Sequence, residues 1–167
     1  NMPVIRNLER PEAQPFYIRS MILFKKKRIE LGEGHIIQYT LFEHKGLGGI
    51  WIYHWKTVLQ NRFHTHAFNS TAFLLSGKYL EEVIVDGEII TRVVVDRFKP
   101  RKLPMDYCHR IKKADPNTWT IVFFGKWKSH WWEYFQDTGV WVKYGWGRKV
   151  LDKRQAYKEN IDILKKD

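Results

Sequence analysis

Residues 64–77 read HTHAFNSTAFLLSG, and residues 104–109 read PMDYCH. In an extended segment, residues two apart point to the same face, so His64 and His66 are predicted to reach one common point. The apolar and aromatic residues that follow indicate a strand, and the Ser-Gly pair that ends at Gly77 indicates a turn after it. The sequence thus predicts two imidazoles close to the start of a short strand.

Short strands are predicted along the whole middle of the chain. They cover residues 35–42, 50–55, 71–75, 79–85, 89–95, 119–124 and 140–144. Asp86-Gly87 is the clearest hairpin signal, because both residue types tolerate the positive φ that a tight hairpin turn requires. Close, even spacing of short strands is typical of a β-sandwich or barrel rather than of βαβ units.

The two ends of the chain are expected to differ from this middle. Asp152 and Gln155 have the spacing of a capping box, and apolar residues after them fall on one helical face. A C-terminal α-helix is therefore predicted over about residues 152–164. Residues 16–24 fit neither the helical nor the strand period, so both structures stay open there.

Composition favours a single domain over residues 1–167. The chain is long enough for one hydrophobic core, and 44% hydrophobic against 28% charged residues argues against a disordered protein. The apolar runs are too short for a membrane span, and no segment resembles a signal peptide. The one cysteine, Cys108, excludes an internal disulfide and is interpreted as a small buried hydrophobe. We therefore expect a cytoplasmic protein that does not bind membranes.

The chain is strongly basic, with 29 Lys and Arg against 18 Asp and Glu and a formal net charge of +11. Such an excess attracts nucleic acids, phosphorylated small molecules or acidic surfaces. One compact basic run covers residues 25–28, and two others, residues 97–102 and 110–113, lie on either side of the PMDYCH segment. No zinc-finger, RNP-like or basic-zipper pattern accompanies them. A small anionic partner is favoured over nucleic acid.

The two quoted segments resemble the two sequence motifs of the cupin superfamily, over about residues 59–125. The first motif reads His-x-His, three or four residues, Glu, six residues, Gly. His64, His66 and Gly77 stand at its histidine and glycine positions, and Ser70 stands where the motif has its glutamate. The order of the matching residues carries the resemblance more than any single match does.

The second cupin motif reads Gly, five residues, Pro-x-Gly, two residues, His, and an Asn after three more. Pro104 and His109 keep this spacing. Phe98 and Asp106 replace the two glycines, and Lys113 replaces the asparagine. The second motif is therefore retained at its proline and its histidine alone.

The resemblance implies an all-β fold, the cupin double-stranded β-helix or jelly-roll barrel, with the predicted C-terminal α-helix packed on it. It also implies one divalent transition metal held by His64, His66 and His109. Three imidazoles suit Fe(II), which is favoured, and also Zn, Ni, Co, Mn or Cu. A three-histidine set without the glutamate is similar to that of the thiol dioxygenases, in which Fe(II) binds substrate and oxygen.

Tyr79 and Glu81 share one face of the predicted strand 79–85. If that face points inward, both side chains lie beside the metal and orient substrate or water there, so we assign them as catalytic candidates. The alternative is an outward-facing carboxylate on a strand, and it stays open.

Four further residues are assigned to substrate binding. Arg62 and Arg110 are sequence neighbours of the ligands and have the chemistry to clamp a carboxylate or phosphate, although an outward position is equally expected. Phe68 and Trp119 are expected to line the cavity and keep it dry.

The favoured function is a mononuclear non-haem iron-dependent oxygenase, a dioxygenase-type oxidoreductase, that acts on a small anionic substrate. One alternative is a non-catalytic cupin that binds a small acidic or nucleotide-like ligand. Another is a metal-dependent lyase or isomerase on the same scaffold. A homodimer is also expected, because eight Trp exceed what one small barrel needs inside. Four tryptophans are candidates for its interface: Trp131, Trp132, Trp141 and Trp146.

Overall fold

The computed structural model of the protein describes residues 21–30, 33–59 and 62–155. These ranges contain thirteen β-strands and one short 3-10 turn, η1 (Trp146–Arg148), so the prediction of an all-β fold is confirmed. No helix in the described part of the chain has the length and apolarity needed to cross a bilayer.

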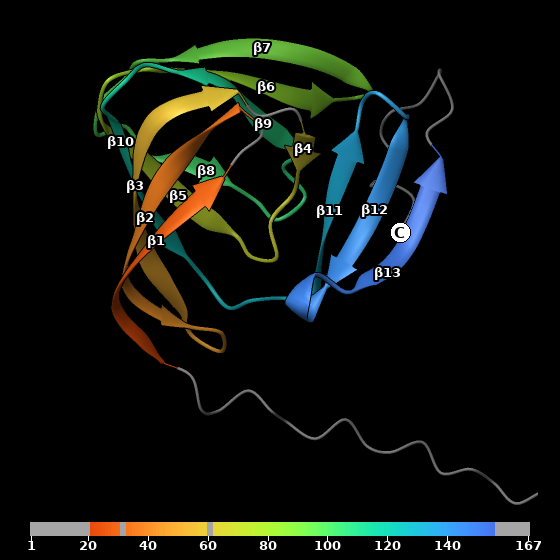
Figure 1. Ribbon diagram of the computed structural model, residues 1–167, viewed down its shortest axis with the longest axis horizontal. Helices are drawn as coiled ribbons and strands as arrows, with labels where there is room; N and C mark the ends of the chain where they lie inside the picture. The colour runs from red at the N-terminus through yellow and green to blue at the C-terminus, as the bar shows by residue number, and fades with distance from the viewer. Residues whose placement is uncertain (1–20, 31–32, 60–61, 156–167) are drawn as a thin grey trace, which may run out of the picture.

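One antiparallel sheet forms one wall of the barrel. Its strands, in spatial order, are β1 (Ile22–Glu30), β2 (Glu33–His44), β3 (Gly48–Leu59), β10 (Thr118–Phe124), β5 (Ser70–Ser76) and β8 (Arg101–Leu103). β1 pairs with β2 alone among the described strands and is therefore an edge. The long strands β2 and β3, which share the largest interface of the fold, curve around the interior (Figure 1).

A second antiparallel sheet closes the barrel. Its strands, in spatial order, are β7 (Glu88–Val94), β6 (Tyr79–Val85), β9 (His109–Ala114), β4 (Arg62–His64), β11 (His130–Phe135), β12 (Val140–Gly145) and β13 (Val150–Gln155). The two sheets meet where β3 pairs with β9 at Val58 and Ala114. Figure 1 shows β1 to β3 on one side of the molecule and β11 to β13 on the other. The result is a jelly-roll barrel of the cupin type.

Two turns carry the conformations that their residues predict. Asp86 and Gly87 have φ values of 51° and 85° and join β6 to β7, as the hairpin signal indicated. Gly77 has a φ of 76°, and a Cβ added there would lie 2.7 Å from the Cα of Thr118. Only glycine fits this turn between β5 and β6, because both the backbone angle and the space exclude a side chain.

Within the described residues, the core consists of three clusters of buried side chains. One fills the barrel between the two sheets and includes Trp55, Leu74 and Tyr79. A second packs β4 and β6 against β11 and β12, with Phe63 and Trp141 fully buried in it. The third includes Trp51 and Phe68 and lies beside the histidines. Alternating burial along β5 shows how period-2 patterning turns one face of a strand to the interior.

The predicted C-terminal helix is wrong where it can be tested. Residues 152–155 belong to β13, which pairs with β12 from Val140 opposite Gln155 onward, and residues 156–164 lie outside the described residues. Asp152 and Arg154 are partly buried and their neighbours exposed, which is a strand period and not a helical one. One edge of β12 pairs with β11, and its other edge offers backbone hydrogen-bond partners to residues 150–155, which therefore add to the sheet as a strand.

The four tryptophans proposed for a dimer interface are buried or partly buried, not exposed. Trp132 and Trp141 are 4% and 0% exposed and pack together in the second core cluster, so neither is available to a partner. Trp131 and Trp146 are partly buried. Strand β11, which the sequence pattern did not predict, is what turns Trp132 inward. The homodimer itself stays a prediction.

Candidate metal centre

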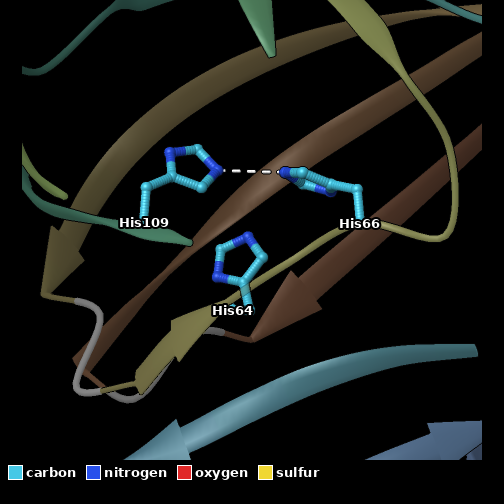
Figure 2. Close-up of side chains that lie close together, drawn as sticks. All are labelled: His64, His66 and His109. Carbon is cyan, nitrogen blue, oxygen red and sulfur yellow. Dashed lines mark hydrogen bonds between the residues drawn. The ribbon is translucent and has the colours of Figure 1, made fainter. Parts of the chain in front are cut away.

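The three histidines come together at the junction of β4 and β9. His64 is the last residue of β4 and stands directly opposite His109, the first residue of β9. His66 lies two residues further along the extended segment that leaves β4. Figure 2 shows the three rings turned toward one centre from these two chain segments, and one ligating nitrogen from each lies within 4.8 Å of the others.

The spacing of these nitrogens fits one transition-metal ion. The Nε2 atoms of His66 and His109 are 3.0 Å apart. Two nitrogens bound at about 2.1 Å on adjacent corners of an octahedron lie about 3.0 Å apart. The ring of His64 completes the triangle, with centroids 5.0 Å from His66 and 4.9 Å from His109. Three imidazoles on one side leave the opposite side free for further ligands.

Burial keeps the site in the protonation state that metal binding needs. Loss of solvent, and next the neighbouring His109, together lower the pKa of His64 to about 3. The pKa of His66 is also well below its usual range, first through burial and then through His64 and His109. A metal binds the neutral imidazole, so the unprotonated rings are ready ligands at neutral pH.

Glu81 lies next to this centre but does not enter it. It is fully buried, and its Oε1 lies 2.7 Å from Nδ1 of His109. Its Oε2 accepts hydrogen bonds from Arg101 and, at 3.1 Å, from the hydroxyl of Tyr107. Burial alone would raise the pKa of Glu81, but His109, Arg101 and Tyr107 together lower it. Glu81 therefore lies inward, a position that the sequence left open, and its contact is with the ring of a candidate ligand.

Tyr79 lies on the same face of β6 and lines the interior cavity. Its hydroxyl accepts a hydrogen bond from Arg101. Burial raises the pKa of Tyr79 to about 12, so the hydroxyl keeps its proton at neutral pH. Because Arg101 can only donate, the Tyr79 hydroxyl accepts from it and keeps its own proton for another acceptor. A molecule bound in the cavity, which the Tyr79 ring borders, would provide such an acceptor.

The cavity has a volume of about 200 Å³ and is bordered by all three histidines. Its wall is mostly apolar and includes the rings of Trp51, Tyr53, Trp55 and Phe68. Ser70, at the position of the missing motif glutamate, also borders it. None of the described residues that border this cavity is an Asp, Glu, Lys or Arg. Any charge brought into it would therefore be balanced chiefly by a metal ion.

Of the four predicted substrate-binding residues, one borders the cavity and three do not. Phe68 borders the cavity and stacks on His66 with ring centroids 5.5 Å apart. Trp119 lies on the other face of β10, stacked on His54 at 3.9 Å. Arg62 lies over the Phe135 ring and 3.7 Å from Glu133, and Arg110 pairs with Glu82, so neither borders the cavity. Their predicted substrate contacts find no support in this arrangement.

Arg101 and Tyr107 are the functional candidates that the sequence reasoning missed. Arg101 is the first residue of β8 and belongs to the basic run 97–102, whose sequence indicated only charge near the site. Tyr107 is two residues before His109, so the period of an extended segment would have placed the two side chains on one face. Cys108, between them, is buried away from this face as predicted.

No protein-family model matches the sequence, and no curated protein matches it. Solved structures that share part of the fold include the following three. CapF, the capsular polysaccharide assembling protein of Staphylococcus aureus, has 18% identity and a TM-score of 0.47 over 62% of this chain and 29% of CapF. Oxalate decarboxylase of Bacillus subtilis has 13% identity and a TM-score of 0.48 over 64% of this chain and 28% of that chain. An RmlC-like cupin from Shewanella frigidimarina has 15% identity and a TM-score of 0.44 over 60% of this chain and 84% of its own length.

This chain therefore matches less than a third of CapF and of oxalate decarboxylase. Similarity at this level says nothing about what the chain binds or does. The fold rests on the barrel itself, in which the segments of both histidine motifs are paired across β4 and β9. With three histidines converging inside it, the barrel is a cupin-type fold with a candidate site for a divalent metal.

Proposed function

We propose that this chain is a mononuclear, iron-dependent oxygenase of the cupin type that acts on a small anionic molecule with an apolar body. The observation that carries the proposal is the set of three converging imidazoles on the wall of a small aromatic cavity. His64, His66 and His109 would hold the ion. When bound, Fe(II) would supply the redox chemistry with dioxygen that amino-acid side chains cannot supply.

The chain's own residues account for binding and orientation. Trp51, Trp55 and Phe68 form an apolar surface that excludes water and accepts the body of the substrate. Tyr79, which stays protonated, donates a hydrogen bond to an acceptor group on the substrate. An acidic group on the substrate would lie at the ion, because the described wall has no cationic side chain. The net charge of +11 favours the approach of such an anion.

The experiment that tests this function combines metal analysis with oxygen uptake. Protein purified without added metal is analysed for bound metals, then loaded anaerobically with Fe(II) and supplied with small aromatic and branched-chain carboxylic acids. We expect substrate-dependent oxygen uptake in the wild type, none in His109→Ala, and an unchanged rate in His44→Ala, which removes a histidine at the far end of β2.

The other outcomes separate the alternatives. Turnover without oxygen uptake would replace the oxygenase with a lyase or isomerase that uses the metal as a Lewis acid. Saturable binding of a carboxylic acid with no turnover, in protein that takes up no metal, would replace it with a non-catalytic binding protein.

A further inference from the structure

Arg101 connects Tyr79, in the cavity wall, with Glu81, which in turn contacts the candidate ligand His109. One guanidinium nitrogen donates to the hydroxyl of Tyr79 and another donates to Oε2 of Glu81. Tyr79 and Glu81 are two residues apart on β6 and so share one face of that strand. The side chain of Arg101 is 19% exposed and that of Glu81 is 0% exposed, so water screens this ion pair little.

The second oxygen of Glu81 determines which nitrogen of His109 carries a proton. An ionised carboxylate can only accept hydrogen bonds, so Nδ1 of His109, 2.7 Å from Oε1, must be the donor. In a neutral imidazole the other nitrogen, Nε2, then carries the lone pair and can only accept a hydrogen bond or bind a metal. That nitrogen is the one that lies 3.0 Å from Nε2 of His66, on the side where the three rings converge (Figure 2).

We propose that Arg101 and Glu81 are positioning residues for the metal centre: they hold His109 as its Nδ1–H tautomer in one orientation and connect it to Tyr79 at the cavity wall. This inference rests on the proposed metal site. The planar guanidinium suits the task because it donates in two fixed directions at once, to the hydroxyl and to the carboxylate. A lysine ammonium at the same place has no such fork.

The simpler alternative is that Arg101 and Glu81 are merely a buried ion pair that stabilises the barrel. The chain provides a matched comparison one residue further along β6. Glu82 is 4% exposed and binds Arg110 and Lys112, with its Oε2 2.6 Å from Nε of Arg110. Its partners face away from the cavity, so removing its charge disturbs a similar ion pair without touching a histidine ligand.

The test measures Co(II) binding to the full-length, metal-free protein by calorimetry and by visible absorption. In Glu81→Gln and Arg101→Lys we expect a dissociation constant for Co(II) roughly 10- to 100-fold above wild type, which is typical when a partner of a ligating histidine is changed. The d–d absorption bands of bound Co(II) should shift as well, because the ligand field changes with the orientation of His109. Glu82→Gln should match wild type in both measurements.

Two variants keep the test decisive if one of them folds poorly, and circular dichroism identifies which are folded. Equal Co(II) affinity and identical bands in wild type and in every folded variant of this pair would overturn the positioning role, even though His109→Ala loses Co(II). The positioning role would be overturned equally if Glu82→Gln weakened binding as much as Glu81→Gln does. Wild-type protein that binds no Co(II) would overturn the metal site itself, and this inference with it.

Discussion

At the scale of single residues, the site depends on imidazoles that burial keeps uncharged. His64 and His66 have depressed pKa values, and His109 has a carboxylate behind it. A solvated histidine must lose a proton to bind a metal at mildly acidic pH, whereas the rings of His64 and His66 have already lost it. The same burial destabilises the metal-free protein at low pH, since it forbids protonation that the unfolded chain allows.

Single replacement of any ligand candidate should abolish metal retention and leave the barrel folded. In His64→Ala, His66→Ala or His109→Ala we expect a loss of Co(II) affinity greater than the roughly 10- to 100-fold typical of changing a ligand's partner. The three core clusters do not depend on these side chains, so the far-ultraviolet spectrum should be unchanged. Metal content after dialysis is the measurement. Full metal content in both His64→Ala and His109→Ala would contradict the assignment.

The stability of the metal-free protein should fall as the pH is lowered from 7 to 5. The folded-state pKa values of His64 and His66 lie below the unfolded value of about 6.5, so the unfolded state takes up protons that the folded state does not. Each such group contributes a slope of up to about 1.4 kcal/mol per pH unit below about 6.5.

Urea unfolding at several pH values, with a chelator present, measures this slope. The double variant His64→Gln, His66→Gln should have a shallower dependence than wild type. Equal slopes in the two proteins would show that these rings are protonated in the folded state as well.

The ligands were accessible to sequence reasoning because their spacing is local. His64 and His66 are two residues apart, and Pro104 and His109 keep a motif spacing. Arg101 was not accessible in the same way, since its contacts with Tyr79 and Glu81 bridge 22 and 20 residues and depend on how β8 pairs with β5. Parity along β6 grouped Glu81 with Tyr79, but only the folded chain shows that this face points inward and that the partner of Glu81 is a histidine ring.

At the scale of elements, strands whose sequences alternate were predictable and strands defined by their neighbours were not. The strands at residues 71–75, 79–85 and 119–124 were each predicted to within one residue of the observed ends. β13 was mistaken for a helix because its capping-box spacing is a local signal, whereas its hydrogen bonds come from β12. Pairing across the sheet is a non-local interaction that outweighs weak local propensity.

The turn at Gly77 offers a test at this scale. Gly77→Ala should lower the free energy of unfolding by about 3 kcal/mol, because a Cβ at positive φ would also collide with buried Thr118. Gly147→Ala is the matched control, since Gly147 has a similar φ of 67° but no atom within 4 Å of the added Cβ. Its cost should be about 1 kcal/mol. Chemical denaturation of both variants gives the comparison, and equal costs would mean that the close approach to Thr118 is unimportant.

At the scale of the whole molecule, the metal centre lies where the chain leaves the second sheet after β4 and passes toward β5 in the first sheet. His64 and His109 sit on paired strands, and His66 sits on the connection that leads to β5 in the first sheet. An ion bound to all three would link the second sheet to the connection that leads into the first sheet. Metal binding should consequently stabilise the global fold and not just the local site.

Saturating Co(II) should raise the melting temperature of the metal-free protein. At one hundred times the dissociation constant, an ion that binds only the folded chain adds about 2.7 kcal/mol, or roughly 5–10 °C for a chain of this size. Differential scanning calorimetry with and without Co(II) measures the shift. The double variant His64→Ala, His109→Ala should show none, and an equal rise in that variant would point to binding elsewhere on the chain.

The basic run at residues 25–28 lies on β1, which is an edge strand among the described strands. Lys25, Lys26, Lys27 and Arg28 are all exposed, on a strand that pairs with β2 alone among the described strands. An open strand edge is a template on which other chains can add, and rows of like charge oppose that addition. The charge of this run therefore has a physical effect that requires no bound partner: it opposes edge-to-edge addition of a second molecule to β1.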